Sequence, residues 1–107
     1  MTECTSLDAA RKLAGVEFYR TCKDYEGRIH VSGENGKADQ WYFLYRSDTL
    51  LVWLLSHGDS IEITPDIEGF NCTFWKDHYD YNGVNIFLAD ALAEVVLKVP
   101  MGGQDAR

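Results

Sequence analysis

The closing segment of the chain, residues 86–99, constrains the fold more than any other stretch. Apolar residues recur there at helical spacing and form one stripe, which comprises Leu88, Leu92, Val95, Val96 and Val99. Polar residues four positions apart form the opposite stripe, which comprises Asp90, Glu94 and Lys98. A helix with this pattern must bury its apolar stripe against another layer of the protein. We therefore expect an amphipathic C-terminal helix, ended by Pro100 and Gly102, that packs on the rest of the chain.

Strand-like segments supply that second layer. A short helix is predicted first, over residues 7–14, because Ser6 can cap it and Gly15 can end it. Alternation of apolar and polar residues then predicts strands over 16–22, 28–32, 40–46, 60–64 and 70–75. The third of these strands is apolar on both faces, which is typical of a central strand covered twice.

Three connections are less regular. Residues 47–58 fit a short helix, which we favour, or a strand buried on both faces. Asn-Gly pairs predict tight turns at 33–36 and at 82–83, the second inside a polar loop over 77–85. Pro65 is expected to stop the strand before it.

These elements predict one α+β domain over residues 1–107. We expect a mostly antiparallel sheet of about five strands, with the short N-terminal helix and the C-terminal amphipathic helix packed on it. The chain is 46% hydrophobic, which is enough for a core, and its length suits a single domain. Residues 1–5 and 101–107 are expected to fray.

Acidic residues dominate the second half of the chain. Residues 47–97 contain nine carboxylates and one cation, Lys76, so the net charge of −7 comes from this half of the chain. Charge of one sign restricts the partners of a protein more than its fold. Direct binding to nucleic acid is disfavoured, because phosphate neutralisation needs clustered Lys and Arg.

Other broad features suggest a reduced, cytoplasmic protein. The longest apolar run, residues 50–55, is far shorter than a membrane span, and the N-terminus lacks the pattern of a signal peptide. Three cysteines, Cys4, Cys22 and Cys72, show no paired spacing, so free thiols are expected. We predict no membrane contact and no cofactor.

Candidate chemistry is sparse. Asp77, His78 and Asp80 cluster in one predicted loop, but their spacing matches no closed metal site, so we expect a solvated polar loop and no metal. Cys22 and Cys72 fall in predicted strands, and Cys72 points inward, as a core residue would. The sequence also has no nucleophile elbow and no phosphate-binding glycine loop. We therefore predict a protein that is not an enzyme.

The acidic half has two interpretations. It is a solvated face that keeps the protein soluble, or it is a docking surface for a basic partner. Aromatic residues lie among the acids, and Tyr and Trp are preferred anchors of interfaces. The predicted partner-binding residues are Glu62, Asp66, Glu68, Trp75, Asp77, Tyr79, Asp80, Tyr81, Asp90 and Glu94. The segment 75–81, flanked by the closing helix, fits a docking site best.

Two stretches resemble small bacteriophage proteins of the phage ABA sandwich type. These are residues 5–10, which open the first helix, and residues 88–98 of the Ala/Leu-rich closing helix. The aromatic run 40–43 matches the middle of those proteins loosely. The resemblance implies a phage or prophage accessory protein with a helix–sheet–helix build. Such proteins often bind host machinery, which suggests an inhibitor of a host nucleic-acid-handling defence complex, such as a CRISPR surveillance complex.

Two alternative functions stay open. The chain could be a homo-oligomeric structural or accessory protein, a homodimer for example, with Trp41, Trp53 or Trp75 as the anchor of a self-interface. It could also be an immunity-type inhibitor of a basic nuclease toxin, which relies on the same electrostatics.

Overall fold

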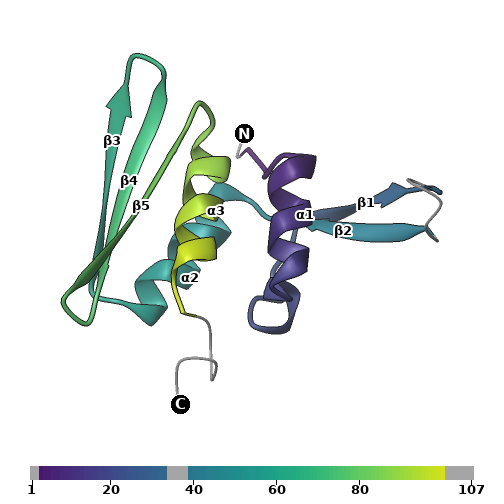
Figure 1. Ribbon diagram of the computed structural model, residues 1–107, viewed down its shortest axis with the longest axis horizontal. Helices are drawn as coiled ribbons and strands as arrows, with labels where there is room; N and C mark the ends of the chain where they lie inside the picture. The colour runs from purple at the N-terminus through teal and green to yellow at the C-terminus, as the bar shows by residue number, and fades with distance from the viewer. Residues whose placement is uncertain (1–2, 34–38, 101–107) are drawn as a thin grey trace.

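The computed structural model describes residues 3–33 and 39–100. Its helices and strands follow one another along the chain as shown in Figure 1. They are α1 (Leu7–Gly15), the 3-10 helix η1 (Phe18–Arg20), β1 (Gly27–Val31), β2 (Gln40–Leu44), α2 (Ser47–His57), β3 (Ser60–Asp66), β4 (Gly69–Lys76), β5 (Tyr79–Asn85) and α3 (Leu88–Lys98).

The described strands form two antiparallel sheets, a ribbon of β1 and β2 and a three-stranded sheet in the order β3-β4-β5. The α+β class, the strand number and the two terminal helices are confirmed. The ribbon packs on α1, whereas α3 packs on β4 and β5. Figure 1 places the helices between the two sheets, so the strands do not meet in one sheet.

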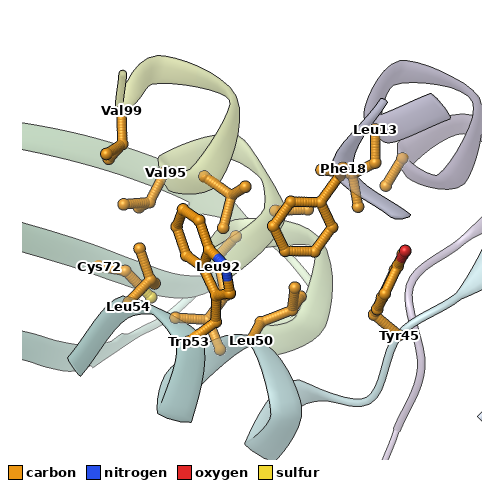
Figure 2. Packing of buried hydrophobic residues seen from close by; sticks show 14 of the residues in the cluster. Leu13, Phe18, Tyr45, Leu50, Trp53, Leu54, Cys72, Leu92, Val95 and Val99 are labelled. Carbon is orange, nitrogen blue, oxygen red and sulfur yellow. The ribbon is translucent and has the colours of Figure 1, made fainter. Parts of the chain in front are cut away.

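The core lies where the three helices converge. Helix α2 was the favoured prediction for its segment, and Leu50, Trp53 and Leu54 on it are buried. Figure 2 shows these three side chains directed from α2 toward α3. The ring of Phe18 meets that of Trp53 edge-on, with 5.1 Å between ring centroids, and joins α1 to the same core.

The strand predicted over 16–22 is wrong. Residues 18–20 form η1, and Glu17 before it has φ 56°, in the left-handed region. This residue turns the chain back after α1, which allows Phe18 to enter the core with 0% of its surface exposed. The alternation of residue types that predicted a strand therefore reflects one buried aromatic residue within a turn.

The central position predicted for the third strand is also wrong. Among the strands that the structure describes, β2 pairs with β1 alone, and Trp41 on it is 50% exposed. Single side chains cover part of its aromatic surface instead. Tyr25 lies over Phe43, with ring centroids 4.3 Å apart, and the Arg28 guanidinium lies 4.5 Å from the Trp41 ring centroid. The predicted turn at 33–36 falls largely outside the described residues.

The three-stranded sheet differs from the prediction in two of its strands, β3 and β5. Strand β3 continues through Pro65 to Asp66, because β3 is an edge strand and tolerates a missing N–H. Asp77 and His78 have φ 52° and 72° and form the tight turn that starts β5. The loop predicted over 77–85 is therefore mostly a strand.

Gly83 lies inside β5 and not in the predicted turn. A Cβ at this position would lie 2.3 Å from the carbonyl oxygen of Ala91 in α3. Glycine therefore allows the close approach of the closing helix to the sheet, and its position after Asn82 suggested a turn only by coincidence.

The described part of the N-terminus is held in place, contrary to the expected fraying. The Thr5 N–H donates to the carbonyl of Tyr45, and Ser47 N–H donates to the carbonyl of Glu3, at 2.9 and 3.0 Å. Thr5 is 4% exposed. The other residues expected to fray, 1–2 and 101–107, lie outside the described chain.

Candidate functional site: an acidic sheet face

The register of β3, β4 and β5 sorts their side chains into two faces. The inner face carries Cys72 and Phe74, both fully buried beneath the helices. The outer face, which we call the acidic face, comprises Ser60, Glu62, Thr64, Asp66, Asn71, Thr73, Trp75, Asp80, Asn82 and Val84. In the described chain, all helices lie on the inner side of this sheet and the acidic face is bare (Figure 1).

The charge of the acidic face has one sign. Glu62, Asp66 and Asp80 are exposed on it, and no Lys or Arg of the three strands points to this side. Among the described residues, Glu62 and Asp80 have no side-chain hydrogen bond or ion pair. Asp66 accepts a hydrogen bond from the backbone N–H of its neighbour, Ile67, at 2.6 Å. The three carboxylates therefore present their charge to solvent.

The middle of the acidic face is ordered by amide and hydroxyl groups. The side-chain amide of Asn82 donates to Asn71 Oδ1 at 2.5 Å and to Thr73 Oγ1 at 3.1 Å, across two strands. Trp75, 37% exposed, lies opposite Asp80 in the register. The exposed Trp75 indole thus lies beside the Asp80 carboxylate, next to the hydrogen-bonded side chains of Asn71, Thr73 and Asn82.

The predicted docking segment 75–81 does not share one face. Trp75 and Asp80 belong to the acidic face, whereas Tyr79 and Tyr81 alternate to the inner side. Tyr81 is half-buried, and its ring centroid lies 6.4 Å from that of Phe74. Tyr79 is 67% exposed at the sheet margin.

Two other predicted residues lie in the hairpin turns. Asp77 is in the turn before β5, where its carboxylate contacts the Lys76 ammonium at 3.2 Å. Glu68 is exposed in the turn between β3 and β4. These turns lie at opposite ends of β4, so the two carboxylates flank the sheet and are not neighbours.

The two predicted residues on α3 are occupied by contacts within the protein. Asp90, expected on the outer stripe of its helix, is 7% exposed, and its Oδ1 accepts the Ser6 N–H at 2.8 Å. The carboxylate of Glu94 accepts from Val84 N–H at 3.2 Å and from the Asn85 side-chain amide at 3.0 Å. The outward position expected for Asp90 is therefore wrong, because the N-terminal segment covers it.

Among the described residues, Lys98 forms no ion pair with Glu94, although the two residues are four positions apart on α3. Its ammonium donates to the carbonyl oxygen of Asn82, at 2.5 Å. The polar stripe of α3 thus fastens the helix to β5. We therefore leave Asp90 and Glu94 out of the docking surface that we propose below.

Two of the cysteines are core residues. Burial raises the pKa of Cys72 to about 11, and burial also raises the pKa of Cys22. Both thiols are therefore protonated near neutral pH, whereas the thiolate is the nucleophilic form. Across residues 3–33 and 39–100, no three His, Cys, Asp or Glu side chains gather as a metal site would require.

The structure also has a groove that the sequence does not predict. It has a volume of about 370 Å³ and lies between α2 and residues 21–24. Two cations and two acids line it: Lys23, Arg46, Asp24 and Asp48. The Arg46 guanidinium holds the Asp48 carboxylate through two nitrogens, at 2.7 and 3.0 Å, and lowers its pKa. The groove lacks the single-signed charge of the acidic face, and no sequence pattern links the separate segments that form it.

Comparisons with known proteins give no match. No family model matches the chain, and neither a curated protein nor a solved structure is significantly similar to it. The resemblance to phage accessory proteins therefore stays a prediction. In the described residues, no helix has the length and apolar character needed to cross a membrane.

Proposed function

We propose that the protein binds a basic protein surface through its acidic face and acts by binding, not by catalysis. The observation that carries this proposal is the bare outer side of the β3-β4-β5 sheet, where Glu62, Asp66 and Asp80 are exposed and no Lys or Arg of the three strands lies on the same side. Complementary charge steers association and selects partners.

Hydrogen bonds between side chains of the acidic face support its role as a binding surface. The Asn82 amide donates to Asn71 and Thr73, so these polar side chains are already held in place before a partner binds. A preorganised surface loses less conformational freedom when it binds. Trp75 adds an amphipathic anchor among the acids, as is common at the centre of interfaces.

The partner class follows from the charge. Surfaces rich in Lys and Arg belong largely to proteins that handle nucleic acid, and an acidic sheet can occupy the groove that nucleic acid would fill. In a phage or prophage, the corresponding role is inhibition of a host defence complex. Inhibition of a basic nuclease toxin relies on the same contacts.

A charge-matched pair of variants tests the proposal. The first, Glu62→Gln/Asp66→Asn/Asp80→Asn, neutralises the acidic face. The second, Asp8→Asn/Glu17→Gln/Asp48→Asn, removes the same charge from exposed acids elsewhere. Binding to immobilised polylysine, measured by biolayer interferometry at low and at physiological salt, compares both with the wild type.

We expect the face variant to weaken binding about tenfold, because exposed charge pairs contribute about 0.2–1 kcal/mol each. The second variant should weaken it by less than about threefold, through net charge alone. Equal losses in the two variants would mean that no docking face exists.

Self-association is the second candidate, and the exposure of Trp41 and Trp75 favours it. Trp41 is 50% exposed on β2, and the ribbon of β1 and β2 lies at the other end of the molecule from the β3-β4-β5 sheet (Figure 1). Trp53 is 5% exposed within the core and cannot anchor a self-interface. Static light scattering over a range of protein concentrations separates a monomer that binds other proteins from an oligomer.

A further inference from the structure

Four large apolar side chains are exposed at one end of the acidic face. They are Ile67, Val84, Ile86 and Phe87, which are 100, 51, 64 and 55% exposed. None of them belongs to the hydrophobic core that the described residues form. A group of exposed large apolar side chains at one end of a sheet is uncommon on a monomer and typically marks an interaction site.

The backbone brings these residues to one place. Gly69, with φ 136°, ends the β3–β4 turn that holds Ile67, and a Cβ built on it would lie 2.4 Å from Ile86 Cα. Val84 points to the acidic face and pairs with Asn71, two residues after Gly69. Phe87 follows Ile86 directly in the chain. Figure 1 shows the β3–β4 turn and the start of α3 at the same end of the sheet.

Local stability does not explain this composition. Phe87 is the N-cap residue of α3 and offers no side-chain acceptor to the helix, a position where Ser, Thr, Asp or Asn is preferred. Ile67 is a β-branched residue in a hairpin turn and buries none of its side chain. Local rules broken without a gain in packing are typical of functional positions.

The surroundings specify what fits there. The carboxylates of Asp66 and Glu68 flank Ile67 along the chain, and both are exposed. From this end the acidic face extends along β4 for about 20 Å to Trp75, at about 3.3 Å per residue. The apolar group is thus continuous with a strip of carboxylates that has an aromatic residue at its far end.

We propose that Ile67, Val84, Ile86 and Phe87 form an apolar anchor site that receives the aliphatic side chains of a basic polypeptide segment bound along the acidic face. This inference rests on the proposed function and names its partner chemistry: cations for the carboxylates and an aliphatic anchor for the end of the sheet. Burial of the anchor contributes affinity, and the carboxylates contribute rate and selectivity.

Two synthetic peptides of equal length and charge serve as probes, one of alternating lysine and leucine and one of alternating lysine and serine. Fluorescence anisotropy gives their affinities for the wild type and two variants. Ile67→Ser/Phe87→Ser removes the anchor site. Val52→Ser/Leu55→Ser is the matched control, because these side chains on α2 are 65 and 48% exposed away from the acidic face.

We expect the wild type and the α2 control to prefer the leucine peptide about tenfold, which corresponds to 1.4 kcal/mol. The preference should vanish in the Ile67→Ser/Phe87→Ser variant, whose near-ultraviolet circular dichroism should match that of the wild type. No preference in the wild type, or an unchanged preference in that variant, overturns the anchor site.

The acid-neutralised variant separates this proposal from the proposed function. Glu62→Gln/Asp66→Asn/Asp80→Asn should weaken both peptides by a similar factor. If both peptides bind equally and this variant weakens them, the docking face holds and the anchor site fails. If this variant binds both peptides as tightly as the wild type, the docking face itself fails.

Discussion

The carboxylates on the two sides of the three-stranded sheet differ in what they contact. On the inner side, Asp90 and Glu94 of α3 accept backbone or side-chain N–H groups and hold the helix and the N-terminal segment together. On the outer side, Glu62 and Asp80 have no partner among the described residues. The sequence presents all four as one acidic run, but only the second pair is available to another molecule.

The same contrast applies to packing. The inner face is closely packed around the centre of β4 and β5, since Cys72 and Phe74 are fully buried and Gly83 lies against α3. The outer face ends in open solvent and carries Trp75 and Val84 partly exposed. Substitutions on the outer face should therefore leave the free energy of unfolding unchanged. Such substitutions can reveal a binding surface, because they alter binding without altering stability.

Gly83→Ala should give the largest effect, because it adds a methyl group where the inner face meets α3. The new Cβ would lie 2.3 Å from a backbone oxygen, which cannot rotate away. We expect a loss of about 3 kcal/mol in the free energy of unfolding, measured in urea. Gly27→Ala is the control, because no atom lies within 4 Å of its Cβ; equal effects would refute the tight contact.

Asp90→Ala should give the next largest effect and separates the two groups of acids. It removes the carboxylate acceptor of the Ser6 N–H, and the Asp90 side chain is 7% exposed, so we expect a loss of about 2 kcal/mol. Asp80→Ala on the acidic face should change stability by less than about 0.5 kcal/mol. Urea titration of both variants measures the difference, and similar losses would contradict the division.

Periodic signals in the sequence predicted the elements well. The stripes of α1 and α3 and the alternation around Ile61 and Cys72 concern contacts between near neighbours, which spacing alone defines. The predictions failed where a distant segment decides. Asp90 is covered by residues 84 positions away, and Gly83 is read as a turn residue unless the approach of α3 is known.

The candidate site was predicted in part for the same reason. Alternation in the predicted strands 60–64 and 70–75 implies that Glu62 and Trp75 face away from the core, and the register places them on one surface. Alternation does not show that Tyr79 and Tyr81 point to the other side, because the polar composition of residues 77–85 predicts a loop there. The sequence does not predict the apolar anchor site, because Ile67 and Ile86 lie far apart in the chain.

Phe87→Ser should give a smaller effect than Gly83→Ala or Asp90→Ala, and of opposite sign. Serine at the N-cap can accept a hydrogen bond from the first turn of α3, where Phe87 offers no side-chain acceptor. Only the buried part of the phenyl group loses its packing, because Phe87 is 55% exposed. We therefore expect a gain of about 1 kcal/mol in the free energy of unfolding, measured in urea. Destabilisation would mean that the phenyl group packs on α3 or β5 and belongs with the inner face. A gain, combined with loss of the leucine-peptide preference, would show that this end of the sheet is built for binding at the expense of stability.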